Sequence, residues 1–290
     1  MQNHPIWKNG TRYFILFSYI YSMNSEKVGL VLSGGGTKGI AHAGVLKFLA
    51  EKNIAVDVLS CCSAGSIVGC LYAIGKKPEE ILEFFKSIYF FNWKHFAFNQ
   101  PGLVSSVIFR NYLSPVFGEM KLGDLDKEVK IVATELVGGT EKIFDKNFKI
   151  VDAIIASCSI PGVTTPYIID DEMYCDGGVL NNFPADIIRK DCDKLIGVFV
   201  SPPHDIKISD LKSIKAIVSR SYDLLSYRIE KIKFDHCDWF ISSQELSTFG
   251  TFERRKDRLE QIFNIGYQAA KNSFDESRFY PVLKEEERIV

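Results

Sequence analysis

The chain has 290 residues, of which 46% are hydrophobic and 24% charged, and its formal net charge is -1. This composition predicts a globular protein with a substantial core, excludes a disordered chain, and gives no reason to expect a nucleic-acid partner. The seven cysteines are an odd number without a C-x-x-C pair suited to zinc or redox chemistry. We therefore expect reduced, mostly buried thiols rather than a disulfide framework.

The N-terminus carries an ambiguous targeting signal. The apolar stretch at residues 13–21 is similar to the core of a short signal peptide, but it contains Ser18 and lacks an A-x-A cleavage pattern. It is too short to span a bilayer, and Met23 offers a more ordinary start. We expect residues 1–24 to be a loose tail or an over-extended start, and residues 25–290 to form a single domain. We expect a cytoplasmic protein, peripheral to a membrane at most, with secretion left open.

Apolar runs of strand length alternate with helical periodicity through the first two thirds of the chain. Continuous Val, Ile and Leu runs bounded by turn residues are typical of strands covered on both faces, as βαβ units require. The pattern therefore predicts an α/β sandwich. The predicted strands lie at residues 28–32, 56–60, 129–134 and 195–200, and the predicted helices at residues 38–52, 63–74 and 151–156.

Residues 84–118 break this alternation. They carry Phe84, Phe85 and Phe109, with six further aromatic residues between Phe85 and Phe109. The simpler interpretation is a helix pair that packs on the core. The functional interpretation is an apolar cap over a pocket for acyl chains, because clustered aromatic side chains suit an apolar ligand.

Two long amphipathic helices follow the strand at residues 195–200. Apolar side chains recur at three- and four-residue spacing from Leu211 to Ile232 and again from Leu259 to Ala270. We predict that both are packing helices, each burying its apolar face.

A glycine loop connects the first predicted strand to its helix. Gly34, Gly35 and Gly36 let backbone N–H groups approach a negative oxygen, and the helix that follows Lys38 and Gly39 directs its positive end at the same place. The loop satisfies G-x-G-x-x-G, the dinucleotide fingerprint, but the same geometry also suits an oxyanion formed during attack on an ester. The loop alone predicts an anion site.

A second strand-to-helix turn carries a candidate nucleophile. The strand at residues 56–60 leads into Cys61, Cys62 and Ser63, followed by two small residues. A serine on such a sharp turn presents its hydroxyl above the sheet, as in the G-x-S-x-G elbow. Cys61 stands where that motif has its first glycine. Serine needs a base, and Asp176, in a D-G-G turn after an apolar hairpin-like segment, is the best candidate.

These motifs, in their order and spacing, resemble the patatin-like phospholipases. The resemblance rests on the glycine loop, on Ser63, on the segment at residues 156–162 and on Asp176, and it covers roughly residues 27–200. It implies a three-layer α/β/α sandwich with a mostly parallel central sheet, and a serine lipid acyl hydrolase that acts through a Ser63–Asp176 dyad without a cofactor.

The resemblance also implies that the amides of Gly34, Gly35 and Gly36 form an oxyanion hole supported by Lys38 and Gly39. Lys38 stands where many members carry arginine, so bidentate bracing of the loop would be lost while a positive charge is kept. The implied partner is a lipid or acyl-ester substrate, with transient membrane-surface contact. The sequence predicts neither the particular ester nor the oligomeric state.

Three alternatives remain. A Ser-His-Asp esterase would use His204 or His236 after Asp176. A dinucleotide-binding protein would need an acidic ribose ligand about twenty residues after the loop, and Asp57 precedes the apolar part of its strand. A non-catalytic lipid-binding protein could keep the same fold. No His, Asp or Glu spacing predicts a metal site, and we expect the acidic residues at 170–172 to be a hairpin tip.

Overall fold

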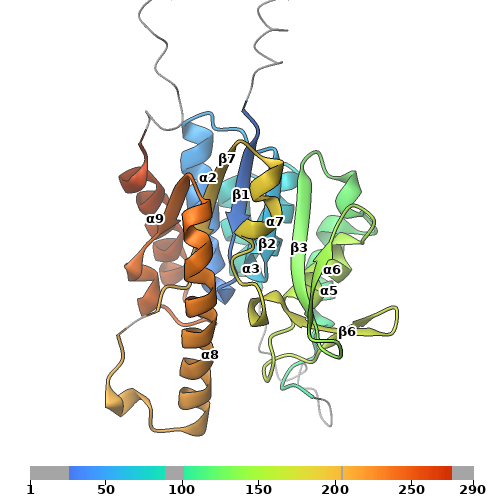
Figure 1. The fold of residues 1–290 in the computed structure, drawn as a ribbon, viewed down its shortest axis with the longest axis vertical. Coiled ribbons are helices and arrows are strands. Elements are labelled where there is room, and N and C mark those ends of the chain that lie inside the picture. The colour runs from blue at the N-terminus through green and yellow to red at the C-terminus, as the bar shows by residue number, and fades with distance from the viewer. Residues whose placement is uncertain (1–25, 89–100, 204, 276–290) are drawn as a thin grey trace, which may run out of the picture.

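The computed structural model describes residues 26–88, 101–203 and 205–275. They form an eight-stranded sheet in the order β5-β6-β3-β2-β1-β7-β8, with β4 paired to β3 (Figure 1). The run β3-β2-β1-β7-β8 is parallel, whereas β4 and β6 pair antiparallel with β3, and β5 antiparallel with β6. The strands are β1 Val28–Leu32, β2 Val58–Cys62, β3 Glu128–Glu135, β4 Thr140–Phe144, β5 Tyr167–Ile169, β6 Glu172–Asp176, β7 Lys194–Phe199 and β8 Trp239–Ser242.

The strands β1, β2 and β7 are buried on both faces, which is why they are mostly apolar. In β1, Leu30 and Leu32 face the larger core and Val31 faces a smaller core on the opposite side of the sheet. Side chains alternate between the faces of a strand, so a fully buried strand needs apolar residues at successive positions. The continuous runs in the sequence are explained by this two-sided burial.

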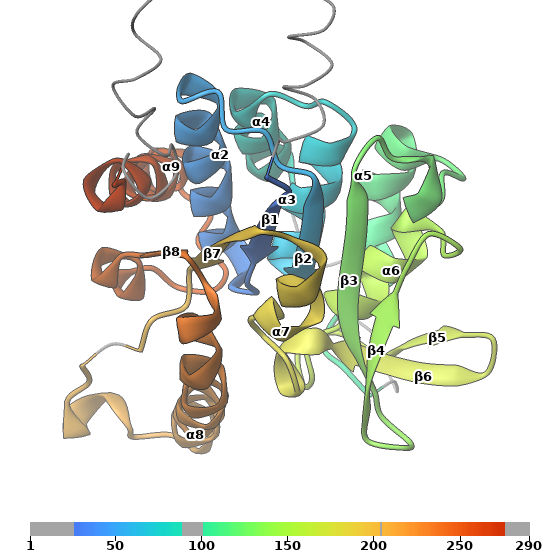
Figure 2. The same ribbon diagram turned by 45° about the horizontal axis from the view of Figure 1, so that its top comes forward.

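Helices cover both faces of the sheet (Figure 2). The larger core lies under α2, α3, α4, α5, α6 and α9, and the smaller core lies under α7 and the 3-10 helix η7. The fold is thus the predicted α/β/α arrangement, with one thick and one thin helical layer. The helices are α2 Ile40–Glu51, α3 Ala64–Ala73, α4 Pro78–Ser87, α5 Ile108–Phe117, α6 Ile150–Ser157, α7 Ala185–Ile188, α8 Ile214–Glu230, α9 Lys256–Ser273 and η7 Lys231–His236.

The strand register brings the two predicted loops together. Leu32 pairs with Cys61 across β1 and β2, so the segments that follow these strands leave the sheet side by side. Val132 of β3 pairs with Cys62, and its neighbour Ala133 pairs with Asp176 of β6. The carboxyl ends of β1, β2 and β6 therefore meet at one place.

Most predicted elements are confirmed, and the differences are local. The predicted strand at residues 28–32 is β1, whereas β4 and β8 were not predicted. β4 has only two consecutive apolar residues, and β8 is only four residues long. The N-terminal tail at residues 1–24 lies outside the described residues. Of the aromatic region at residues 84–118, α5 and the end of α4 are described and residues 89–100 are not.

The two C-terminal helices differ from each other. In α9 the apolar side chains Leu259, Ile262 and Ala270 are buried, as expected for a packing helix. In α8 the expectation is wrong, because Val218 and Leu225 are 62% and 65% exposed. The periodicity predicted the helix, but it did not show whether another element covers the apolar face.

Candidate active site

Ser63 occupies a strained turn between β2 and α3. Its backbone has φ 50° and ψ −123°, a conformation that a residue with a side chain rarely adopts. The turn is tight because α3 starts against β1: a Cβ on Gly65 would lie 2.2 Å from the carbonyl oxygen of Leu32. The small residues after Ser63 therefore permit the sharp elbow that the sequence predicted.

Asp176 lies at the end of β6, within hydrogen-bonding distance of this serine. The Ser63 hydroxyl donates to Asp176 Oδ2 at 2.6 Å, and the amide of Gly178 donates to the other carboxylate oxygen, Oδ1, at 2.8 Å. Both side chains are buried. A hydroxyl oriented toward a fixed carboxylate has the geometry of a nucleophile with its base.

Burial raises the pKa of the Asp176 carboxyl to about 6. The hydrogen bonds from Ser63, from the Gly178 amide and from the Cys62 thiol stabilise the carboxylate and act in the opposite direction, but burial has the larger effect. The carboxylate is therefore a stronger base than an exposed aspartate and is still mostly ionised at neutral pH. A base whose pKa lies near the operating pH is effective at accepting a proton.

The segment at residues 156–162 connects the two residues, a role that the sequence did not predict. The Ser63 amide donates to Ser157 Oγ at 2.8 Å, and Ser157 Oγ donates to the carbonyl oxygen of Val132 at 2.6 Å. The Asp176 amide donates to the carbonyl oxygen of Ser159 at 2.8 Å. One short segment, from the last residue of α6 to Ser159, therefore holds both backbones and fixes the separation of the hydroxyl and the carboxylate.

The three loop glycines lie beside the nucleophile but differ in their hydrogen bonds. A Cβ on Gly34 would lie 3.1 Å from the Cβ of Ser63, and the Gly34 amide donates to the carbonyl oxygen of Asn182 at 3.1 Å. The amides of Gly35 and Gly36 donate to no acceptor among the described residues. These two amides, rather than all three, are thus available to a negative oxygen.

The glycine loop is held from outside by the segment before α9. Gly36 has φ +57°, and a Cβ there would lie 2.3 Å from the carbonyl oxygen of Thr251. The same oxygen accepts from the amide of Thr37 at 2.8 Å and from its hydroxyl at 2.9 Å. Only glycine fits this conformation at this distance, so the loop has one fixed shape.

Lys38 and Gly39 follow the three glycines in the 3-10 helix η1, Gly36–Gly39. Partial burial of the Lys38 side chain lowers the pKa of its ammonium group. The negative charge of Asp223 on α8 acts in the opposite direction and raises this pKa. A Cβ on Gly39 would lie 2.6 Å from the Cβ of Ala64. Gly39 therefore lets η1 approach the start of α3, and the Lys38 charge has an acidic neighbour.

Cys61, the departure from G-x-S-x-G, has a structural explanation. Its side chain is fully buried, and a Cβ on Gly69 of α3 would lie 2.5 Å from Cys61 Sγ. The thiol therefore occupies space that Gly69 leaves empty. All seven cysteines are unpaired, and five of them, including Cys61, are buried.

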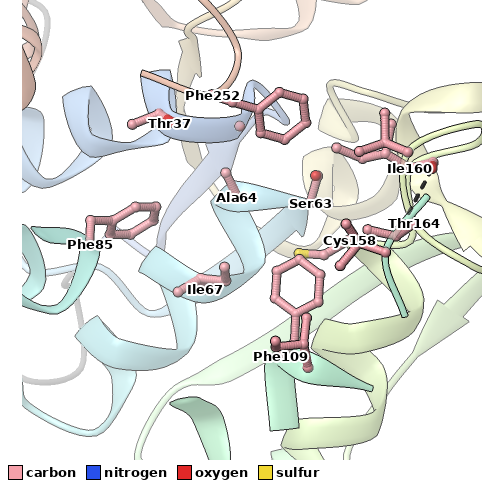
Figure 3. A pocket seen from close by; sticks show the side chains of 14 residues that line it. Thr37, Ser63, Ala64, Ile67, Phe85, Phe109, Cys158, Ile160, Thr164 and Phe252 are labelled. Carbon is pink, nitrogen blue, oxygen red and sulfur yellow. Dashed lines mark hydrogen bonds between the residues drawn. The ribbon is translucent and has the colours of Figure 1, made fainter. Parts of the chain in front are cut away.

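An apolar cavity adjoins Ser63 (Figure 3). The empty space at this place measures about 570 Å³ when the part that is open to solvent is counted. Phe85 and Phe109, both from the predicted aromatic region, contribute to the wall, as do Ile67 and Cys158. Among the described residues, the lining consists of Gly36, Thr37, Ser63, Ala64, Ile67, Phe85, Val104, Ile108, Phe109, Cys158, Ile160, Val163, Thr164 and Phe252. A hydroxyl at the wall of an apolar cavity suits a ligand with one polar end.

Of the two histidines proposed for a triad, the structure describes only His236, and it does not bring His236 to this site. His204 lies outside the described residues. His236 precedes β8, and its carbonyl oxygen accepts from Arg189, which also donates to the carbonyl oxygen of Asp193 just before β7. His236 therefore lies at the amino edge of the parallel strands, whereas Ser63 follows the carboxyl end of β2.

The acidic residue considered as a ribose ligand is not at this site either. Asp57 accepts a hydrogen bond from the amide of Val28, so it too lies at the amino edge, away from the glycine loop. Within the described ranges, no three His, Cys, Asp or Glu side chains cluster as a metal site would require.

Two further residues connect the site to α8, and sequence reasoning missed both. Asn182 holds Gly34, as described above, and the buried carboxylate of Glu230 accepts from the amides of Asn182 and Phe183 at 2.7 and 3.0 Å. Glu230 stands in an amphipathic helix where an acidic residue is expected to face solvent. In the folded protein Glu230 is only 1% exposed, and this burial, which the sequence does not reveal, marks it as a positioning residue.

Of the helices in the described part of the chain, none combines the length and the hydropathy that spanning a bilayer requires.

The chain is similar to several known proteins. A patatin-like phospholipase domain-containing protein of Caenorhabditis elegans is 29% identical over 177 residues, which cover 58% of this chain and 13% of that protein. The neuropathy target esterase of Drosophila melanogaster is 24% identical over 295 residues, covering 87% and 20%. The lysophospholipase NTE1 of Debaryomyces hansenii is 31% identical over 183 residues, covering 60% and 12%. The chain thus spans at most a fifth of the length of these three relatives.

A solved structure and a family model extend the comparison. The structure of VipD from Legionella pneumophila superposes with a TM-score of 0.57 at 15% identity, covering 87% of this chain and 68% of that chain, which shows a shared fold. The model of the patatin-like phospholipases matches residues 30–189, more than half of the chain. The chain belongs to the patatin-like phospholipase family.

Proposed function

We propose that the protein is a serine acyl hydrolase that cleaves carboxylic esters of lipids, of the phospholipase A or lysophospholipase type. The observation that carries the proposal is the 2.6 Å hydrogen bond from Ser63 to Asp176 at the wall of an apolar cavity. Relatives named as an esterase and as a lysophospholipase support this reaction class.

In the proposed reaction, Asp176 Oδ2 accepts the hydroxyl proton while Ser63 Oγ attacks the ester carbonyl carbon. The carbonyl π electrons move to oxygen, and the resulting oxyanion accepts hydrogen bonds from the amides of Gly35 and Gly36. When the tetrahedral intermediate collapses, the alcohol oxygen leaves with the proton that Asp176 held. The product of this half-reaction is an acyl ester on Ser63.

Water completes the cycle. It attacks the acyl-enzyme carbonyl and transfers a proton to Asp176, and collapse of the second intermediate releases the fatty acid and returns the proton to Ser63 Oγ. The acyl chain lies in the cavity beside Ile67 and Phe109, whose apolar side chains exclude water from it. The Gly34 amide supports the loop rather than the oxyanion, because it donates to Asn182.

The natural substrates of such an enzyme are amphiphiles in membranes or micelles, so the proposal includes transient contact with a lipid surface by a cytoplasmic, peripheral protein. No cofactor takes part. His204 and His236 have no role in this scheme.

Hydrolysis of p-nitrophenyl decanoate tests the proposal. Ser63→Ala and Asp176→Asn should each lower kcat by about 10³-fold or more, whereas Ser209→Ala, an exposed serine in the loop before α8, should retain wild-type turnover. The double variant His204→Ala/His236→Ala distinguishes the schemes, because a triad enzyme would lose activity and a dyad enzyme would keep it. A wild-type protein with no turnover on any acyl ester would support the non-catalytic alternative.

A further inference from the structure

Helix α8 carries an exposed apolar stripe, which we define as Ile214, Val218, Leu225, Ile229 and Ile232. These positions follow one another at three-, four- and seven-residue intervals, so they lie on one side of the helix and its continuation into η7. Ile214, Val218, Leu225 and Ile232 are 83%, 62%, 65% and 74% exposed. Ile217 and Leu224 extend the stripe along one side and are about half exposed. The stripe runs about 25 Å, the length of a 17-residue helix.

The last turn of α8 is anchored to the domain on the side opposite the stripe. Glu230 is buried and accepts from the amides of Asn182 and Phe183. Tyr227 packs against Phe199 and Phe234 of the smaller core. These contacts at the carboxyl end of α8 set the direction in which the stripe faces.

The same helix borders the active site. A Cβ on Gly178 would lie 3.3 Å from the Tyr222 hydroxyl, and Gly178 is the residue whose amide holds the Asp176 carboxylate. Asp223, the residue after Tyr222, interacts electrostatically with Lys38 beside the glycine loop. A surface bound along α8 would thus lie next to the site at which we place ester hydrolysis.

Charge identifies the kind of surface. Residues 205–232 contain six basic and four acidic residues, whereas the whole chain has 35 and 36. Of these four acids, Glu230 is buried under the helix and Asp223 interacts with Lys38, while Arg228 and Lys231 are exposed beside the stripe. Apolar side chains flanked by cations are the arrangement with which an amphipathic helix lies in the interface of an anionic membrane.

We propose that α8 is the membrane-docking element of this protein, and that the stripe inserts among the acyl chains of an anionic phospholipid surface while Arg228 and Lys231 contact the headgroups. The biological purpose rests on the proposed function, because docking here would present membrane esters to Ser63. The binding itself needs no catalysis.

Flotation with lipid vesicles tests docking separately from hydrolysis. The protein should carry Ser63→Ala, so that the lipids stay intact, and the vesicles should contain phosphatidylcholine and phosphatidylglycerol at 3:1. We expect this protein to float, and Leu225→Ser/Ile229→Ser to lower the partition coefficient by about tenfold or more. Arg228→Gln/Lys231→Gln should weaken binding to these vesicles but not to pure phosphatidylcholine.

A matched control uses exposed apolar residues elsewhere. Leu136 and Val137, in the turn between β3 and β4, are 40% and 84% exposed, and Leu136→Ser/Val137→Ser should float like the parent. In the Ser63-containing protein, the Leu225→Ser/Ile229→Ser variant should keep its melting temperature and its turnover of soluble p-nitrophenyl butyrate.

Three results would overturn the docking proposal. The Ser63→Ala parent protein could fail to float, or the Leu225→Ser/Ile229→Ser stripe variant could float equally well. The stripe variant could also melt at a lower temperature than the wild type, which would show that the chain itself covers the stripe. Light scattering provides one more check, because a dimer that dissociates in the stripe variant, without vesicle binding by the parent, would identify a second copy as the occupant. Flotation without esterase activity would refute the proposed function and leave docking standing.

Discussion

Gly34 and Asn182 are joined by a backbone hydrogen bond in which the Gly34 amide donates to the Asn182 carbonyl oxygen at 3.1 Å. The Asn182 amide donates in turn to Glu230 Oε1 at 2.7 Å. The buried carboxylate of Glu230 on α8 therefore holds the segment around Asn182, and the glycine loop is hydrogen-bonded to that segment. Hydrogen bonds to an ionised acceptor are stronger than those between neutral groups, so Glu230 is well suited to position the loop.

Replacing Glu230 with glutamine should weaken both the fold and the reaction. Glutamine keeps the size, but its NH2 group faces one of the two backbone amides that the carboxylate accepts, and leaving a buried donor unpaired costs about 1–3 kcal/mol. We expect the free energy of unfolding to fall by that amount and kcat to fall while KM stays the same. Urea unfolding and initial rates on p-nitrophenyl butyrate measure these effects.

The matched control for this variant is Glu119→Gln. Glu119 pairs with Lys149 at 2.6 Å but is 82% exposed, so its loss should change stability by about 0.5 kcal/mol or less. If Glu230→Gln unfolds and turns over like the wild type, Glu230 does not position the loop.

The pH dependence of the reaction should follow Asp176. The carboxyl must be ionised to accept the serine proton, and burial raises its pKa from 3.8 to about 6. We therefore expect kcat/KM to be constant above this pH and to fall about tenfold per pH unit below it. The rate of butyrate release from a soluble ester between pH 4 and 8 measures the profile. An acid limb near pH 4 would mean that Asp176 is not the base.

Restoring the glycine of the elbow motif should lower stability but not activity. Cys61→Gly removes a buried thiol that fills the space above Gly69 and adds backbone freedom in β2, which together should cost about 1–3 kcal/mol. Turnover should stay within about threefold of the wild type, because Cys61 contacts neither Ser63 nor Asp176 in the hydrogen-bond network described above. A folded variant with a large loss of turnover would show that Cys61 shapes the elbow itself.

Narrowing the cavity should change the preference for acyl-chain length. Val163 lines the cavity and is only partly buried, so Val163→Phe should add volume there without unfolding the core. We expect kcat/KM for the p-nitrophenyl decanoate to fall about tenfold or more, and that for the butyrate to change little. Val137→Phe, far from the cavity in an exposed turn, is the control. An equal loss on both esters would place the acyl chain elsewhere.

Much of the fold and the family could be predicted from the sequence because the decisive signals are local. A buried parallel strand requires apolar residues at successive positions, and β1 follows that rule. The glycine loop, Ser63 and Asp176 lie in short motifs whose residue types are imposed by tight turns. Their meeting follows from the register that pairs Cys62 with Val132 and Ala133 with Asp176.

What the sequence did not predict depends on contacts between distant segments. The hydrogen bond of Gly34 to Asn182 uses backbone atoms, which every residue carries, so nothing in the composition distinguishes it. Ser157 holds the Ser63 amide across 94 residues of sequence. The exposure of the α8 stripe likewise depends on the absence of a covering element within the described residues, and periodicity alone does not report that.

Labelling with a fluorophosphonate, followed by intact-mass and peptide analysis, tests whether Asp176 activates Ser63 as the nucleophile. We expect a single adduct on the peptide containing Ser63, no adduct in Ser63→Ala, and a rate of labelling lowered by about 10²-fold or more in Asp176→Asn. An adduct on another serine, or labelling that persists in Ser63→Ala, would contradict this expectation.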